Sequence, residues 1–295
     1  MSSLSYAAPT TVDEAVKILS GASGLAKVLS GGTDLLVQLR SGRLKPDVIV
    51  DTKKIPGIIG IRQENGGWVI GAATPGAVVE AHEGLKAQWP GLVEALDLIG
   101  STQVQGRCSL AGNLCNASPA ADSVPALFAA GAVAVVVGPS GRREIPVEQI
   151  PTGPGRTSLG KDEFIFEFRL PARQPRSGDA YLRFIPRTEM DIAVVGCGIN
   201  VTLDEKGVCT AARVALGAVA PTVLLVKEAA DVLVGHTLDQ DTLTKLDAAA
   251  QAAAKPISDK RGTVEYRKKV AGVLARRVAA IAFDRARGKT NGKAH

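Results

Sequence analysis

The sequence is poor in aromatic residues and in histidine. Phe, Trp and Tyr together make up 4% of its 295 residues, and only three histidines are present. So few aromatic rings do not supply the stacking platforms on which single-stranded nucleic acids bind. His82 and His236 have no second histidine at metal-ligand spacing and no paired nucleophile. We therefore expect no metal site and no histidine base.

The four cysteines lack the spacing of a metal or cluster site. None of Cys108, Cys115, Cys197 and Cys209 belongs to a C-x-x-C pair, the arrangement typical of zinc and iron–sulfur ligands. We expect them to be reduced and to behave as small apolar residues. Any iron–sulfur cluster would have to come from another chain.

Long apolar runs are absent as well. The longest candidate, residues 132–137, has the length of a strand and falls far below the ~20 residues of a membrane helix. Residues 1–11 lack the basic and apolar stretches of an export signal. The sequence thus predicts a cytoplasmic protein with no integral membrane segment, peripheral at the inner membrane only through a complex.

The charge balance is weakly basic. The net charge is +6, from 35 Lys and Arg against 29 Asp and Glu. Residues 284–295 supply +3 of this, with four basic residues and one acidic residue, and the remaining surface mixes both signs. A nucleic-acid partner is therefore not expected. A chain of this length with 45% hydrophobic residues can build about two domains.

Hydrophobic patterns and turn residues predict short strands that alternate with helices. Strands are expected at 47–50, 68–71, 164–170, 193–203 and 208–216, and helices at 35–40, 91–99, 125–130 and 263–287, with further helix starts at Thr11 and Thr74. Because no regular βαβ period appears, the class is α+β and not a Rossmann fold. The Pro-rich segment 171–178 marks a boundary, which divides the chain into domains 1–176 and 177–285 and a disordered basic tail, 286–295.

Two runs of small residues carry the main functional signal. The first is residues 30–36, Ser-Gly-Gly-Thr-Asp-Leu-Leu, and the second is 109–113, Ser-Leu-Ala-Gly-Asn, continuing at 117–122 as Ala-Ser-Pro-Ala-Ala-Asp. Glycine lets the backbone come close to a ligand, and consecutive amides form a nest for an anion. Two nests suit a pyrophosphate, although each run taken alone is more often a tight turn.

With two further motifs, 183–187 with 191–193 and 258–262 with 265–267, these runs resemble the FAD-binding medium subunit of molybdenum hydroxylases. That family includes aerobic carbon monoxide dehydrogenase, and its flavin part is fused within xanthine dehydrogenase. The resemblance covers about residues 6–285. It implies a two-lobed FAD-binding domain of the PCMH/vanillyl-alcohol-oxidase type, followed by a smaller C-terminal α+β domain. Residues 258–262 are assigned to domain packing or subunit contact.

The resemblance also implies noncovalent FAD and a set of cofactor-binding residues, with no catalytic residue in this chain. In relatives the residue matching Asp122 contacts the flavin nucleotide; without the resemblance, the favoured role of Asp122 is the N-cap of the helix at 125–130. Arg183 is expected near the flavin, with a surface salt bridge as the alternative. Ala111 replaces a glycine common in the family, and Ile192 an aromatic residue. The predicted cofactor contacts are Leu29, Ser30, Gly31, Gly32, Thr33, Asp34, Leu35, Thr102, Ser109, Gly112, Asn113, Asp122, Ile165 and Arg183.

The resemblance further implies an oxidoreductase subunit that works in a complex. A large partner would carry the molybdenum–pterin cofactor and a small partner the 2Fe-2S clusters, as a dimer of heterotrimers. Electrons would pass from the clusters through FAD to a quinone, NAD, ferredoxin or oxygen. Two alternatives are a stand-alone flavin-dependent oxidoreductase of the same fold and a flavin-free interaction subunit.

A third motif fits a phosphate-binding P-loop in spacing only. Residues 155–161 read Gly-Arg-Thr-Ser-Leu-Gly-Lys, but Asp162 stands where a Ser or Thr hydroxyl should bind magnesium. A strand, not a helix, is predicted to follow. We interpret this segment as a surface loop.

Overall fold

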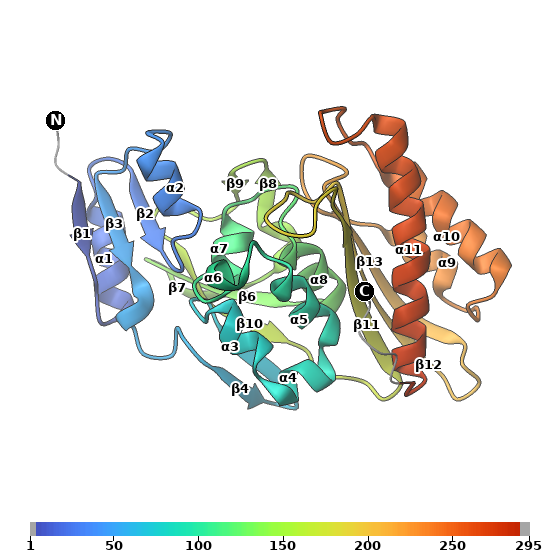
Figure 1. The fold of residues 1–295 in the computed structure, drawn as a ribbon. Coiled ribbons are helices and arrows are strands. Elements are labelled where there is room, and N and C mark those ends of the chain that lie inside the picture. The colour runs from blue at the N-terminus through green and yellow to red at the C-terminus, as the bar shows by residue number, and fades with distance from the viewer. Residues whose placement is uncertain (1–3, 290–295) are drawn as a thin grey trace.

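The fold consists of three adjoining layers of sheet and helix. It is seen in a computed structural model that describes residues 4–289 (Figure 1). Blue elements form one side of the molecule, green ones the middle, and yellow to red ones the other side. Contrary to the sequence expectation, residues 5–51 alternate strand and helix as β-α-β-α-β with parallel strand pairing. The two larger sheets are antiparallel, so the predicted α+β class is confirmed.

The N-terminal part is a small parallel sheet in the order β1-β3-β2. Its helix α1 begins at the predicted cap: the Thr11 hydroxyl accepts a hydrogen bond from the Glu14 amide at 3.1 Å, and the Glu14 carboxylate accepts one from the Thr10 amide at 2.8 Å. The elements are β1 (Ser5–Ala7), α1 (Val12–Gly21), β2 (Ala26–Leu29), α2 (Leu35–Arg40), β3 (Val48–Asp51) and the 3₁₀ helix η1 (Thr52–Lys54).

The middle part is an antiparallel sheet in the order β4-β5-β10-β6-β7, with a cluster of short helices on it. Its strands are β4 (Ile61–Glu64), β5 (Gly67–Gly71), β6 (Val133–Gly138), β7 (Gly141–Pro146) and β10 (Phe164–Leu170), with a separate hairpin of β8 (Pro151–Gly153) and β9 (Arg156–Thr157). Its helices are α3 (Gly76–Glu80), α4 (Glu83–Gln88), α5 (Pro90–Asp97), α6 (Thr102–Gln105), α7 (Leu110–Cys115), α8 (Ser123–Ala130) and the 3₁₀ helix η2 (Val147–Gln149).

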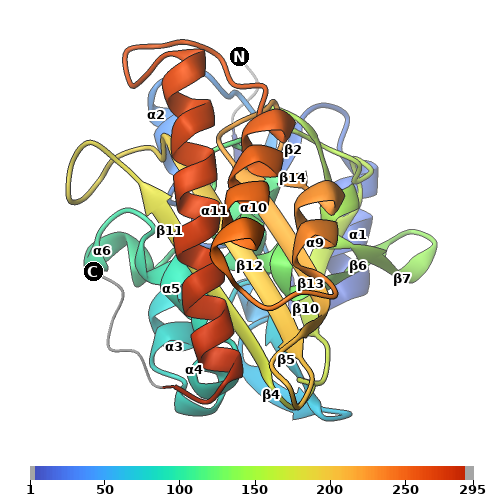
Figure 2. The same cartoon turned by 90° about the vertical axis from the view of Figure 1, so that its right-hand side faces the viewer.

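The C-terminal part is a second antiparallel sheet, in the order β11-β12-β13-β14, with three helices over its outer face (Figure 2). Residues 204–207 join β12 to β13, which pair antiparallel and correspond to the strands expected at 193–203 and 208–216. The elements are β11 (Ser177–Phe184), β12 (Val195–Leu203), β13 (Cys209–Gly217), β14 (Leu224–Leu225), α9 (Lys227–Leu233), α10 (Gln240–Ala253) and α11 (Val264–Ala286). Residues 171–176, where we expect the domain boundary, form neither helix nor strand.

Helix α8 joins the middle and C-terminal parts, since it packs on both β12 and β13. The approach is so close that a Cβ atom on Gly198 would lie 2.7 Å from the carbonyl oxygen of Pro125. Glycine at position 198 therefore allows the sheet and α8 to pack closely. Buried side chains form two clusters, one mainly in residues 15–170 and one in residues 180–286.

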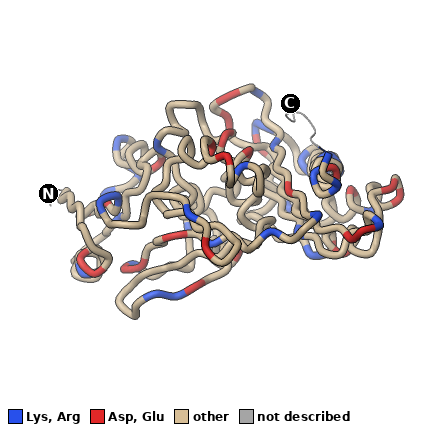
Figure 3. The backbone as a smooth tube through the Cα atoms, turned by 90° about the horizontal axis from the view of Figure 1, so that it is seen from below, with Lys and Arg blue, Asp and Glu red and all other residues tan. Residues whose placement is uncertain are grey.

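The charged surface mixes both signs, and Figure 3 shows Lys and Arg interspersed with Asp and Glu along the chain. Of the basic tail expected from residue 286, residues 290–295 lie outside the described part. Within it, Arg287 and Lys289 pair with Asp284 after the end of α11. Among residues 4–289, no helix has both the length and the apolar character needed to span a membrane.

Candidate functional site

A pocket of ≈ 510 Å³ lies between the N-terminal and middle parts. This volume falls within the range of about 300–1,000 Å³ that is usual for ligand and cofactor sites. Its walls come from β2 and the loop after it, from α2, from the start of α7, and from residues 157–165. The pocket therefore brings together segments far apart in the sequence, including both runs of small residues.

The first run forms a backbone nest in one wall. Gly32 has φ +82°, and a Cβ atom on Gly31 would lie 1.8 Å from the Arg107 carbonyl oxygen. The N–H groups of Gly31, Gly32 and Thr33 donate no hydrogen bond to any described residue. Consecutive unpaired amides of this kind bind anions. The conformation and the close approach both require glycine here.

The second run lies directly against the first. The Ser30 and Ser109 hydroxyl oxygens are 2.7 Å apart in a hydrogen bond, and Ser109 also accepts one from the Gly112 amide at 3.2 Å. This places the start of α7 beside the nest, so the predicted pairing of the two runs is observed.

The structure brings nine of the fourteen predicted cofactor contacts into the lining of this pocket. They are Ser30, Gly31, Gly32, Thr33, Asp34, Leu35, Ser109, Gly112 and Ile165. The other five lie outside its lining: Leu29, Thr102, Asn113, Asp122 and Arg183. Their contact with the cofactor stays a prediction.

Asn113 of α7 is hydrogen-bonded to Ser123, the first residue of α8. Its side-chain oxygen accepts hydrogen bonds from the Ser123 amide at 3.2 Å and from the Ser123 hydroxyl at 2.7 Å. Asp122 occupies the N-cap position of α8, as the alternative expected, but its carboxylate makes no capping hydrogen bond. The Asn113 side chain, from the preceding helix, accepts the bond from the first amide of α8 instead.

Asp122 instead turns toward the C-terminal part. Its two carboxylate oxygens accept hydrogen bonds from the Tyr181 hydroxyl at 2.9 Å and from Arg183 at 2.7 Å. Burial raises the pKa of Asp122 to about 6, although Arg183 and Tyr181 favour the charged form. Arg183 thus forms a salt bridge, as the alternative expected, but its side chain is 4% exposed, so the pair is buried and does not lie at the surface. The Arg183 Nε has no acceptor among the described residues.

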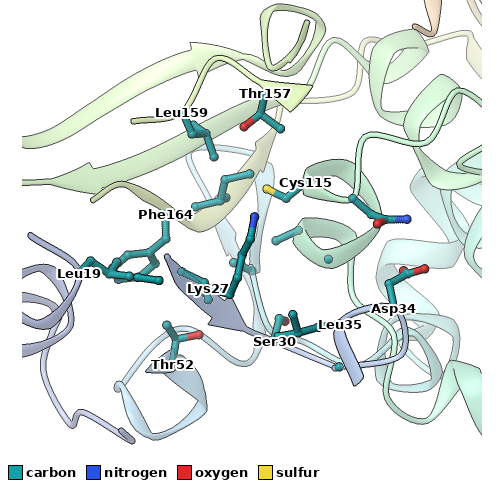
Figure 4. A pocket seen from close by; sticks show the side chains of 18 of the residues that line it. Leu19, Lys27, Ser30, Asp34, Leu35, Thr52, Cys115, Thr157, Leu159 and Phe164 are labelled. Atoms are coloured by element: carbon teal, nitrogen blue, oxygen red, sulfur yellow. The ribbon is translucent and has the colours of Figure 1, made fainter. Parts of the chain in front are cut away.

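Lys27 and Cys115 line the pocket, and we did not predict them. In Figure 4 the Lys27 side chain points into the pocket, toward Cys115. Burial raises the pKa of the Cys115 thiol to about 12, although the charge of Lys27 opposes this rise. A lysine in an otherwise apolar strand just before the glycines was the available signal for this cation.

The segment with P-loop spacing also borders the pocket. Thr157, Leu159, Gly160 and Lys161 belong to its lining, and Figure 4 shows Thr157 and Leu159 across the pocket from Ser30 and Leu35. Ser20 donates a hydrogen bond to Asp162 at 3.3 Å. Lys161 is exposed, as expected of a surface loop, but the loop is part of this site. A strand follows it, as predicted.

The two ends of the pocket differ in chemistry. Leu19 of α1, Leu159 and Phe164 gather toward one end, while the nest and Asp34 lie toward the other (Figure 4). An apolar end suits a ring system, and unpaired amides beside a lysine suit phosphate. The pocket thus fits a long ligand that carries both, as FAD does. Among the described residues, no group of three or more His, Cys, Asp or Glu side chains could hold a metal ion.

Comparison with known families gives two matches that together span almost the whole chain. Residues 2–173 match the family described as "FAD binding domain in molybdopterin dehydrogenase". The chain belongs to this family. Residues 180–282 match the "CO dehydrogenase flavoprotein C-terminal domain". The chain is therefore an FAD-binding subunit of the kind found in dehydrogenases, and the predicted resemblance is confirmed.

Similar proteins align with this chain over nearly the whole length of both sequences. The carbon monoxide dehydrogenase medium chain of Afipia carboxidovorans is 32% identical over 285 residues, covering 97% of this chain and 98% of that one. The xanthine dehydrogenase FAD-binding subunit of Escherichia coli O157:H7 is 30% identical over 288 residues, again with 97% and 98% coverage. A solved carbon monoxide dehydrogenase of Hydrogenophaga pseudoflava aligns with TM-score 0.92 and 32% identity, over 96% of this chain and 98% of that chain.

Proposed function

We propose that this chain carries noncovalent FAD as the electron-transfer subunit of a molybdenum hydroxylase complex. The observation that carries the proposal is the nest, in which three consecutive amides without described partners face a pocket of ≈ 510 Å³. Relatives named as the medium chain of carbon monoxide dehydrogenase and the FAD-binding subunit of xanthine dehydrogenase support it.

The residues of this chain would bind and orient the cofactor. The amides of Gly31, Gly32 and Thr33 would donate hydrogen bonds to its phosphates. Lys27 would add positive charge nearby, and the apolar end of the pocket would exclude water from a ring. We include Leu29, Thr102, Asn113, Asp122 and Arg183 among the proposed contacts.

Arg183 is suited to the flavin ring because its buried Nε lacks a described acceptor. A cation held there would favour negative charge on the ring. Bound FAD would supply the chemistry of the subunit, because a flavin can accept electrons singly and release them in pairs. This chain would contribute position and electrostatics.

The partners in this proposal are a large subunit with a molybdenum–pterin cofactor and a small subunit with 2Fe-2S clusters, arranged as a dimer of heterotrimers. The clusters would deliver electrons, and a quinone, NAD, ferredoxin or oxygen would receive them. The location proposed for the complex is the cytoplasm. Carbon monoxide, purines, aldehydes and N-heterocycles are the substrate classes of such partners.

The test is purification of the complex from its native host. Denaturation should release a yellow cofactor that chromatographs as FAD, and substrate should bleach the flavin in the complex but not in the isolated chain. A colourless chain that FAD does not reconstitute would favour the flavin-free interaction subunit. Substrate oxidation by the isolated chain at the full rate of the complex would favour the stand-alone flavoenzyme.

A further inference from the structure

Lys53 lies behind the nest and bonds to it directly. Its ammonium donates to the Ser30 carbonyl oxygen at 2.9 Å and to the Asp51 carboxylate at 2.7 Å. The neighbouring Lys54 is exposed, and no hydrogen bond or ion pair of its side chain occurs among the described residues. Two adjacent lysines of equal charge thus differ in one respect: only Lys53 bonds to the backbone of the nest.

Asp51 holds Lys53 in place. Its second carboxylate oxygen accepts a hydrogen bond from the Tyr6 hydroxyl at 2.7 Å, and its first also accepts one from the Lys53 amide at 3.1 Å. Burial alone would raise the pKa of Asp51, but the bonds from Lys53 and Tyr6 lower it below its ordinary value. The carboxylate is therefore charged at neutral pH, and the Lys53 ammonium has a fixed anchor.

The bond to Ser30 sets the direction of the first amide of the nest. In a trans peptide the carbonyl and the following N–H point in opposite directions. Because the Ser30 carbonyl faces Lys53, the Gly31 N–H faces away from Lys53. On the other side, the Ser30 hydroxyl bonds to Ser109 at 2.7 Å, so the peptide is held from both sides.

We propose that Lys53 is a positioning residue for phosphate binding, which holds the Ser30 carbonyl so that the Gly31 amide stays available to the cofactor. The inference rests on the proposed function, since it assumes that the nest binds the FAD pyrophosphate. Lys53 acts through the backbone and does not itself contact the phosphate.

Calorimetric titration of the full-length, cofactor-free chain with ADP tests this role, with adenosine as the probe that lacks phosphate. Lys53→Met should weaken ADP binding about tenfold, or about 1.4 kcal/mol, because the Ser30 carbonyl loses the bond that orients the Gly31 amide. Adenosine binding should not change. Lys53→Arg should restore most of the ADP affinity, and Lys54→Met, the matched control, should leave it unchanged.

Asp51→Asn separates positioning from charge, because the two effects have opposite signs. Removing a negative charge near the pocket would tighten ADP binding if long-range electrostatics alone mattered. Positioning predicts weaker ADP binding, since a neutral amide anchors the ammonium less well. The thermal midpoint of each variant shows that it is folded.

Tighter ADP binding in Asp51→Asn would overturn the inference, and so would equal losses in Lys53→Met and Lys54→Met. An equal loss of adenosine affinity in Lys53→Met would show a general structural role and overturn it as well. If the unaltered chain bound neither ADP nor FAD, the proposed function itself would fail. If Lys53→Met bound ADP as the unaltered chain does, and the unaltered chain bound FAD normally, the positioning role of Lys53 would be wrong. The proposed function would then still stand.

Discussion

The middle part of the molecule meets its two neighbours in opposite ways. Toward the N-terminal part the junction is hollow, and the amides of Gly31, Gly32 and Thr33 have no described partner. Toward the C-terminal part the junction is filled, and Asp122 of the middle part pairs with Tyr181 and Arg183 of β11. The open amides indicate a ligand, whereas the paired groups hold two parts of the chain together. The Arg183 Nε has no described acceptor, so it is the group of this pair that stays open to the proposed cofactor.

A second network of polar and cation–π contacts joins the middle and C-terminal parts at the filled junction. Arg173 lies over the Trp89 ring at 4.2 Å and donates to Asp179 at 2.9 Å, while Asp179 accepts from the Gly91 amide at 2.9 Å. Arg285 of α11 pairs with Glu94 of α5. The C-terminal part is thus joined to the middle part by several polar contacts, and the hollow junction is the one that a bound cofactor would stabilise.

The largest expected effect comes from adding one methyl group at the hollow junction. In Gly31→Ala the new Cβ would lie 1.8 Å from the Arg107 carbonyl oxygen, so the loop must move away from the second run. We expect loss of FAD binding by a factor above about 100, and destabilisation of about 1–3 kcal/mol. Gly21→Ala is the control, since nothing lies within 4 Å of its added Cβ. Flavin content equal to that of the unaltered protein would refute the nest.

The next effect tests the filled junction. In Arg183→Met the Asp122 carboxylate stays buried without its cation, and breaking a buried pair in this way costs about 3–5 kcal/mol. Urea unfolding at pH 8 measures the loss. Arg62→Met is the control, because its side chain is 48% exposed and also pairs with a buried carboxylate, Glu167. Equal, small losses in both variants would show that the Asp122 pair does not hold the junction.

The pH dependence of stability gives a finer test of the same pair. The pKa of Asp122 is raised to about 6 from 3.8, so the folded protein holds a proton that the unfolded chain releases above pH 4. This contribution is fully present below pH 3.8 and is lost as the pH rises through 6, by up to about 3 kcal/mol. The stability difference between the unaltered protein and Asp122→Asn should fall over this interval. A difference that rises with pH would mean that Arg183 dominates and lowers the pKa.

The sequence predicted local elements well, because their signals are local. The Thr11 cap, the strand at 164–170 and the last helix follow from capping and periodicity, and the structure shows each within about two residues. The nest was predicted from glycine spacing. That it meets the second run at the Ser30–Ser109 bond follows only from the packing of two distant segments.

The parts of the site that sequence reasoning missed depend on long-range contacts. Nothing near Lys53 in the sequence reveals its bond to Ser30, which is 23 residues away. Asp122 looked like a helix cap because it directly precedes α8, but Tyr181 and Arg183, 59 and 61 residues later, provide stronger partners. The packing of β11 against α8 brings these partners to Asp122, and no local sequence pattern predicts that packing.

The smallest expected effect concerns the loop that has P-loop spacing. Lys161 borders the hollow junction, yet it is exposed, so water screens its charge from a phosphate in the nest. We expect Lys161→Ala to weaken FAD binding less than about threefold, whereas Lys27→Met, inside the pocket, should weaken it more. Flavin fluorescence at low and at high salt measures the FAD dissociation constants of the two variants. Their ratio shows which lysine contributes more to FAD binding. If Lys161→Ala caused the larger loss, the loop would be a second phosphate-binding wall, and the nest would not act alone.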